Sequence, residues 1–229
     1  MGNKLSNKIA VVIGVGCILD RQVIRALLLE GGQVAVLAAS VEDLSQLKYF
    51  LKNEETSRLH PFLTDPLDYT KSLDILAHIK ETWSNIDLVF TTLANYSPLA
   101  TPQDILVADW KRTTEEHIQF YFTNLLILGY LKDETSLYVT AGRQPVVKGD
   151  NQNILADLRH LLRLESHPYF LPELASTNAR YHHLYLKESW GDKDEAVSLK
   201  KDYADYIIQL YLGQTECLEA DVRQVVLSL

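Results

Sequence analysis

The sequence has few of the residues that mark disulfide scaffolds, metal sites and disordered chains. It contains two cysteines, 10 glycines and 7 prolines among 229 residues. Cys17 and Cys217 are far apart, and no C-x-x-C or Cys/His cluster accompanies either, so we expect reducing conditions and no metal site. With 47% hydrophobic and 23% charged residues, the composition is that of a globular protein with a sizeable core.

Positive charge is also scarce. The chain has 22 Lys and Arg residues against 30 Asp and Glu residues, a net charge of −8, and no stretch is rich in Lys or Arg. Because a protein that binds a phosphate backbone needs clustered cations, we expect no nucleic-acid partner.

No apolar run reaches the roughly 20 residues that a membrane-spanning helix needs. The run over residues 120–131 is interrupted by Thr123 and Asn124. The segment 4–19 imitates a secretory signal, with two lysines before an apolar run. It continues through Asp20 into a helical pattern, where a signal would have a small-residue cleavage site. We therefore expect no membrane partner and a cytoplasmic location.

Short apolar runs alternate with amphipathic helical patterns along the chain. The runs are typical of buried parallel strands and cover residues 9–13, 34–37, 88–90, 137–139, 181–186 and 225–227. The first helix is expected to stop at Gly31-Gly32, the second to begin at a Ser40–Asp43 capping box and the third near Asp68. Further helices are expected over residues 110–131, 152–164 and 194–212. This alternation predicts an α/β fold, a doubly wound parallel sheet (Rossmann-like) in three α/β/α layers, as one domain of residues 1–229.

The turn between the first strand and the first helix contains two glycines, Gly14 and Gly16. Glycines at this place allow backbone N–H groups to approach a pyrophosphate at the positive end of the helix. Leu19 stands where the third glycine of the dinucleotide fingerprint would be. The charged residue expected about 20 positions later is also missing, since the chain has Ala38, Ala39 and Ser40 there. The turn is thus a candidate cofactor-binding site, with a simple connecting turn as an equal alternative.

The order and spacing of these landmarks resemble the short-chain dehydrogenase/reductase family. Residues 7–12 resemble its opening strand and residues 86–90 its fourth strand. The T-G-x-x-x-G-x-G motif of the family falls on Ile13, Gly14, Ile18 and Asp20, so one of its three glycines is in register. Its N-N-A-G motif falls on residues 91–94.

The resemblance implies a dinucleotide cofactor, NAD or NADP, and residues that would hold it. Asp65 matches the acidic residue that family members use near the adenine ring. Thr92 and Arg159 match residues that meet a ribose or a phosphate. Asp20 would place a carboxylate near the phosphates, so we expect weakened cofactor binding, with Arg21 able to compensate by folding back.

The catalytic set of the family is absent at the positions that the resemblance assigns to it. The Asn falls on His117, the Ser on Gly142, the Tyr on Leu155 and the Lys on Arg159. None of the 12 tyrosines is followed by a lysine four residues later, so a shifted register does not restore the Tyr/Lys pair. In the family the Tyr hydroxyl donates a proton while the Lys lowers its pKa. We therefore predict no catalytic residue.

Three interpretations follow. The first is a divergent family member without normal hydride transfer, acting as an oligomeric scaffold or a ligand-binding protein. The alternative is an NAD(P)-dependent oxidoreductase for a carbonyl or alcohol substrate, with a non-standard active site in which His117 acts as acid or base. The third is a subunit that stabilises an active paralogue.

The resemblance also implies a homodimer or homotetramer formed through the helices at 110–131 and 152–164, and it leaves room for another protein partner. His182 and His183 are adjacent on a predicted strand and point to opposite faces, so we do not expect them to share a metal.

Overall fold

The computed structural model describes residues 3–51, 53–65, 68–92, 107–131, 135–143, 177, 179–186 and 193–213. Its strands are β1 Ile9–Ile13, β2 Gln33–Ala38, β3 Leu59–Leu63, β4 Leu88–Thr92, β5 Leu137–Arg143 and β6 Arg180–Leu186. Its helices are α1 Ile18–Leu29, α2 Val41–Phe50, α3 Tyr69–Trp83, α4 Val107–Leu128 and α6 Lys193–Leu212, with a short 3₁₀ helix at Asn53–Arg58.

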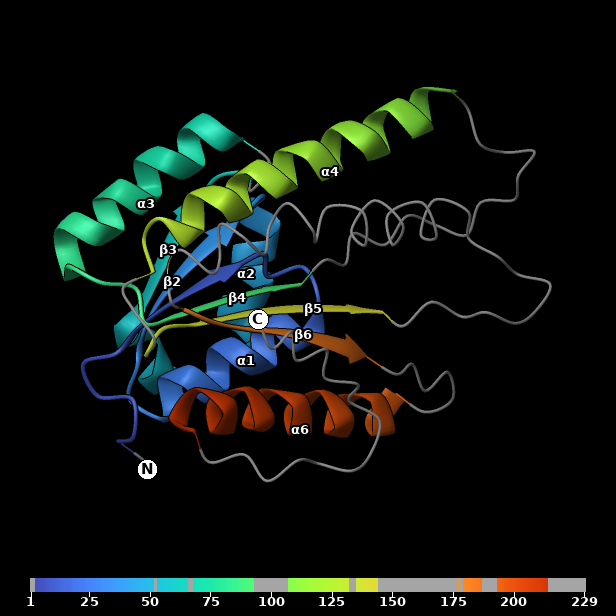
Figure 1. Ribbon diagram of the computed structural model, residues 1–229. Helices are drawn as coiled ribbons and strands as arrows, with labels where there is room; N and C mark the ends of the chain where they lie inside the picture. The colour runs from blue at the N-terminus through green and yellow to red at the C-terminus, as the bar shows by residue number, and fades with distance from the viewer. Residues whose placement is uncertain are drawn as a thin grey trace.

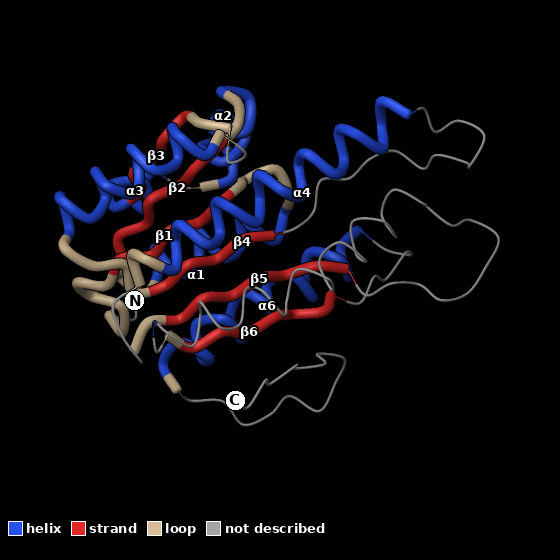
Figure 2. Tube along the Cα trace, turned by 45° about the horizontal axis from the view of Figure 1, so that its top comes forward, coloured by secondary structure: helices blue, strands red, loops and turns tan. Residues whose placement is uncertain are grey.

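The six strands form one sheet in the order β3-β2-β1-β4-β5-β6, and every neighbouring pair is parallel (Figure 2). Helices α1 and α6 pack together on one face, and α3 and α4 lie on the other (Figure 1). The strand order reverses between β1 and β4, which makes their carboxyl ends the switch point of the sheet. The predicted three-layer doubly wound fold is confirmed.

Strand β1 is apolar throughout because its side chains enter the core on both faces of the sheet. Ala10 and Val12 belong to the core cluster beneath α1 and α6, whereas Ile9, Val11 and Ile13 belong to the cluster beneath α3 and α4. Because both faces of the strand are covered by helices, no alternate position is left for a polar side chain.

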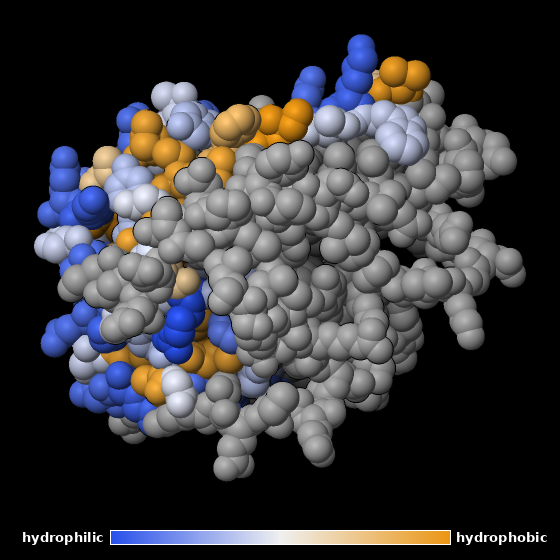
Figure 3. All heavy atoms as spheres, in the orientation of Figure 1, coloured by the Kyte–Doolittle hydropathy of each residue, from blue (hydrophilic) through white to orange (hydrophobic). Residues whose placement is uncertain are grey.

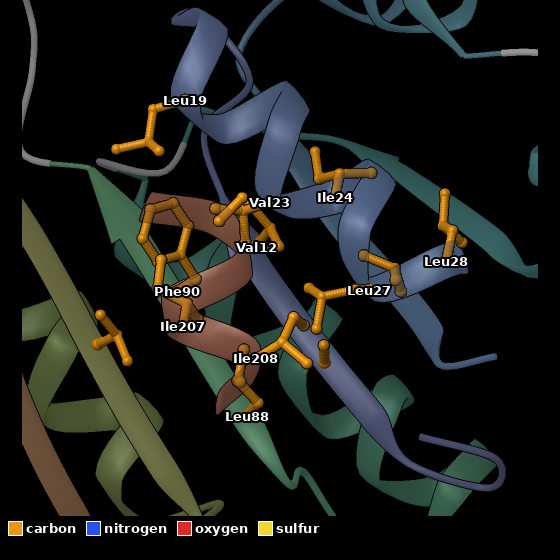
Figure 4. Close-up of a cluster of buried hydrophobic side chains, with 14 of the residues drawn as sticks. Val12, Leu19, Val23, Ile24, Leu27, Leu28, Leu88, Phe90, Ile207 and Ile208 are labelled. Carbon is orange, nitrogen blue, oxygen red and sulfur yellow. The ribbon is translucent and has the colours of Figure 1, made fainter. Parts of the chain in front are cut away.

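Helix α1 packs its apolar side chains against the sheet and α6 near the switch point. Figure 4 shows its buried side chains above β1 and β4 and beside α6; they are Leu19, Val23, Ile24, Leu27 and Leu28. The helix ends at Leu29, and Gly31 then adopts a φ of 90°. The N–H of Gly32 donates to the carbonyl of Leu27 at 3.0 Å. The predicted glycine stop is confirmed, since this left-handed conformation favours glycine.

Strand β3 is absent from the apolar runs that predicted the sheet. Its sequence contains His60 and Pro61, and the strand lies at the sheet edge, where several of its residues are partly or fully exposed. A proline cannot donate to a sheet ladder, so it is tolerated on an edge strand. Helix α4 also begins at Val107, three residues before the predicted start at residue 110. The predicted helix at 152–164 and strand at 225–227 lie outside the described residues.

The amino ends of the strands are held by charged side chains. Lys8 forms a 3.0 Å ion pair with Asp87, and the other Asp87 carboxylate oxygen accepts the N–H of Ile9 at 2.9 Å. Arg180, at the start of β6, donates to the carbonyls of Leu210 and Tyr211 at the end of α6. These bonds lie at the amino ends of the strands, which is the end of the sheet opposite the glycine turn. In the part of the chain that the structure describes, no helix combines the length and hydrophobicity required to cross a membrane.

Candidate functional site

The glycine turn follows β1 at the switch point of the sheet, as the sequence predicts. Gly14 has a φ of 90° and donates its N–H to the carbonyl of Leu37 at 2.8 Å. A side chain is strained in that conformation, so this position requires glycine. Gly16 has no positive φ, and a Cβ built on it would meet no atom within 4 Å. Only the first of the two glycines is therefore demanded by the backbone.

The first turn of α1 is closed by its own side chains. Cys17 is the N-cap residue, and its N–H donates to an Asp20 carboxylate oxygen at 3.0 Å. In return, the N–H of Asp20 donates to the Cys17 sulfur at 3.5 Å. This reciprocal pair is a capping box, and its carboxylate lies at the positive end of the helix. Asp20 is only 1% exposed, so the carboxylate is turned into the protein.

Thr92 joins this group from the last position of β4. Its hydroxyl donates to the second carboxylate oxygen of Asp20 at 2.7 Å. The Cys17 thiol lies 3.9 Å from the same hydroxyl oxygen. The structure thus brings Gly14 and Thr92, both predicted to bind cofactor, to the same place, with the Asp20 carboxylate bonded to Thr92. No local pattern in the sequence indicates the Asp20–Thr92 bond, because 72 residues separate the two.

Burial sets the protonation behaviour of this group. It raises the pKa of the Asp20 carboxyl, and the hydrogen bonds from Cys17 and Thr92 oppose that rise. Burial, together with the neighbouring Asp20 charge, raises the pKa of the Cys17 thiol to about 12. The thiol is therefore protonated at neutral pH and is not a nucleophile.

Arg21 folds back over the outer side of the turn. Its Nε donates to the carbonyl of Val15 at 3.1 Å, and one Nη donates to the carbonyl of Gly16 at 3.4 Å and to Gln46 Oε1 at 2.6 Å. Arg21 is expected to be able to compensate for Asp20 by folding back. The guanidinium does fold back onto the carbonyls of the turn and Gln46 of helix α2, and its charge opposes the rise in the pKa of the Asp20 carboxyl that burial causes.

Two other predicted positions can be placed. Asp65 follows β3 at the carboxyl edge of the sheet and is exposed. The preceding residue, Thr64, donates its N–H to the carbonyl of Ala38 at 2.9 Å, and this bond holds the chain after β3 beside the end of β2. Leu19, at the third glycine position, is 1% exposed and lies in the core cluster, so its bulk is accommodated there. Arg159 lies outside the described residues.

The predicted catalytic positions are only partly described. Gly142 is the sixth residue of β5, and His117 lies on α4, where its side chain is not described. Leu155 lies, with Arg159, outside the described residues. Among the described residues, no group of three His, Cys, Asp or Glu side chains is placed to hold a metal.

A hydroxyl pair close to Gly142 was missed by the sequence analysis. Thr140 Oγ1 lies 2.9 Å from Tyr181 Oη, and the pair joins β5 to β6. The two residues are far apart in the sequence, and the pairing of β5 with β6 brings their hydroxyls together. The next residue of β6, His182, is half-buried, and burial and the nearby Arg180 lower its pKa. The lowered pKa favours the neutral imidazole of His182.

Comparison with known proteins gives a likeness in structure alone. No family model matches the sequence, and no curated protein matches it. A short-chain dehydrogenase/reductase from Serratia marcescens has a TM-score of 0.71 and 14% identity, with 91% of each chain covered. A short-chain dehydrogenase from Burkholderia cenocepacia, solved in complex with NADP, has a TM-score of 0.71 and 14% identity over 91% of this chain and 92% of that chain.

A third solved structure agrees with these two. It is a short-chain dehydrogenase/reductase, described as a glucose/ribitol dehydrogenase, from Brucella melitensis, with a TM-score of 0.70 and 16% identity over 93% of each chain. At such low identity, the likeness concerns only the arrangement of helices and strands. The chain therefore has the fold of the short-chain dehydrogenase/reductases.

Proposed function

We propose that this chain is a short-chain dehydrogenase/reductase-like protein without hydride-transfer activity, and that it acts as a self-associating scaffold. One observation carries the proposal: the carboxylate of Asp20, 1% exposed, lies at the helix N-terminus where a dinucleotide fold binds pyrophosphate. The residues that the family resemblance assigns to the Tyr and Ser positions, Leu155 and Gly142, support the same conclusion. Leu155 cannot donate a proton, and Gly142 has no hydroxyl to polarise a carbonyl.

Two physical effects oppose pyrophosphate binding at this turn. The Cys17 N–H and the Thr92 hydroxyl already donate to Asp20, so a ligand would have to replace an internal bond. An ionised carboxylate also repels a phosphate about 4 Å away by about 1 kcal/mol in water and about 4 kcal/mol at an effective dielectric constant of 20. A repulsion of about 4 kcal/mol would lower the affinity for pyrophosphate almost a thousandfold.

The test is a calorimetric titration of the purified chain with NADH and NADPH, followed by an assay of reduction with a panel of ketones and aldehydes. We expect no heat of binding at millimolar cofactor and no cofactor oxidation above the rate without protein. Stoichiometric binding together with turnover would overturn the proposal.

The runner-up is an NAD(P)-dependent oxidoreductase with a non-standard active site, and the conformation of Gly14 favours it. The left-handed φ of 90° keeps the turn that a dinucleotide fold uses, and the Burkholderia neighbour was solved with NADP. This function predicts cofactor binding, and turnover that falls when His117 is replaced by alanine. The same titration and assay separate the two functions.

An apolar surface on α4 supports the scaffold part of the proposal. Val107, Trp110, Ile118 and Phe122 are 72%, 41%, 47% and 49% exposed, and their spacing places them along one side of the helix. The exposed Tyr69 of α3 meets Phe122 in an edge-to-face contact with ring centroids 6.2 Å apart. Figure 3 shows hydrophobic residues, in orange, among polar ones along the upper edge of the molecule, where α3 and α4 lie. Exposed apolar surfaces of this kind are typical of subunit contacts, so we assign the homodimer or homotetramer contact to this α4 stripe.

A further inference from the structure

We infer that the cleft between α1 and α2 is a binding site for a small aromatic carboxylate. The cleft has a volume of about 590 Å³, within the range of roughly 300–1,000 Å³ that is typical of small-molecule sites. The described residues that line it are Arg21, Ser45, Gln46, Tyr49 and Phe50. They belong to the first turn of α1 and to α2, and none of the described residues at the carboxyl ends of the strands is among them. The inference is therefore separate from the proposed function.

The guanidinium of Arg21 is held in place by the protein, and part of it is left over. Its Nε donates to the carbonyl of Val15, and Nη2 donates to the carbonyl of Gly16 and to Gln46 Oε1. The other nitrogen, Nη1, makes no hydrogen bond to any residue that the structure describes. Because the three bonds already order the side chain, binding an anion through Nη1 costs little additional side-chain entropy.

Gln46 supplies a second donor on α2. Its Oε1 accepts the 2.6 Å bond from Arg21, so the amide nitrogen is the end of the side chain that remains for a ligand. Within the described part of the chain, that nitrogen has no hydrogen-bond partner. A carboxylate has two oxygens, and these can accept from Arg21 Nη1 and from the Gln46 amide.

The charge of the cleft favours a monoanion. Arg21 is the one charged residue among the described lining residues, and the acidic residues of the first turn of α2, Glu42 and Asp43, do not line the cleft. A single positive charge balances a carboxylate. A phosphate dianion would keep an excess negative charge in a chain whose net charge is already −8.

The walls of the cleft favour an aromatic ligand. The side chain of Tyr49 is 95% exposed, whereas Phe50 is half-buried and packs against the core cluster. The hydroxyl of Ser45 donates to the carbonyl of Val41 at 2.9 Å, so it adds no free donor. A ring bound against Tyr49 would cover its apolar surface, and aromatic pairs are more favourable than their buried area alone implies.

The experiment is an NMR titration of the ¹⁵N-labelled full chain with 2-naphthoate. We expect saturable shifts in the amide signals of residues 45–50 and Arg21, with a dissociation constant of about 1 mM or lower, and no shifts for residues 88–92. Naphthalene-2-methanol lacks the charge and should bind about tenfold more weakly. Decahydro-2-naphthoate keeps the charge but lacks the aromatic rings, and it should bind about fivefold more weakly.

Substitutions within the cleft separate its charge from its ring. R21M should weaken binding about tenfold, because the charge-assisted bond is lost. Q46E places a carboxylate beside Arg21, which keeps the guanidinium in place but neutralises it, so it should weaken binding at least as much. Y49L should weaken binding about fivefold, whereas Y49F retains the ring and should keep most of the affinity. K48M is the matched control, because Lys48 is an exposed cation of α2 that does not line the cleft.

Circular dichroism establishes that each variant is folded; if R21M is not, Q46E decides the role of the charge. The inference is overturned if 2-naphthoate at millimolar concentration leaves residues 45–50 unshifted, or if its shifts are confined to residues 88–92 at the end of β4. Equal binding of naphthalene-2-methanol, or full affinity in Q46E, would overturn it as well. Binding of NADPH by the wild-type chain would overturn the proposed function and leave this inference standing.

Discussion

The hydroxyl of Thr92 donates a 2.7 Å hydrogen bond to the carboxylate of Asp20 and so joins the end of β4 to the first turn of α1. These two elements flank the switch point, where a dinucleotide fold holds its ligand. The polar groups of this turn therefore hydrogen-bond one another within the protein.

The T92V substitution should destabilise the fold. Valine has a similar volume but no hydroxyl, so the buried Asp20 carboxylate loses its shortest hydrogen bond. Leaving a buried acceptor unsatisfied costs about 1–3 kcal/mol, and we expect the free energy of unfolding in urea to fall by that amount. The control is T82V, which removes an exposed hydroxyl bonded within α3 and should change stability by about 0.5 kcal/mol or less. Equal effects of the two substitutions would contradict the prediction.

The raised pKa of Asp20 predicts a pH dependence of stability. Between the unfolded-state value of about 3.9 and the higher folded-state value, the folded chain retains a proton that the unfolded chain has released. The free energy of unfolding of the wild-type chain should therefore decrease, relative to D20N, as the pH rises from about 4 through the folded-state pKa.

Urea titrations of both chains across that range test the pH prediction. The difference between wild type and D20N cancels the other titrating groups, and D43N provides the comparison for an acidic residue at the equivalent helix position. A difference between wild type and D20N that is independent of pH would contradict the raised pKa.

The S72A substitution should leave the fold as stable or make it more stable. Ser72 is fully buried in α3, and its hydroxyl has no hydrogen-bond partner in the part of the chain that the structure describes. An unpaired buried hydroxyl is unfavourable, and alanine is a better helix former, so we expect a gain of up to about 1 kcal/mol. Thermal unfolding measures it, with the exposed S45A as comparison. A loss of stability in S72A would show that the hydroxyl has a partner.

The F122E substitution should dissociate the oligomer that we propose. Phe122 lies in the α4 stripe beside Tyr69, and a charge there would have to be desolvated when subunits associate. Sedimentation velocity over a range of concentrations should show a dimer or tetramer for the wild-type chain and a monomer for F122E. Y49E is the matched control, because Tyr49 is a 95% exposed aromatic residue of α2, outside the stripe. A monomeric wild-type chain, or dissociation of Y49E as well, would contradict this assignment.

The sequence predicted the strands that are buried on both faces. Residues 9–13 are found as β1 with its predicted bounds, since a run without polar residues fits only a strand covered by helices on both sides. Strand β3 was not predicted from an apolar run, because it is an edge strand and tolerates His60 and Pro61. The residues that start and stop helices could also be predicted, such as Gly31 after α1 and Asp68 before α3. They act on backbone groups only a few residues away in the sequence.

The sequence by itself determined the layered α/β fold and the glycine turn at its switch point, because hydrophobic period and turn chemistry are local properties of the chain. It could show that Asp20 stands where a glycine is expected, but not where its carboxylate points. Only the tertiary structure decided that, by placing Thr92 from β4 and the N–H of Cys17 around the carboxylate and excluding water from it. The physical reason is that a buried charge takes its partners from whichever elements pack around it, and that packing depends on contacts between residues far apart in the chain.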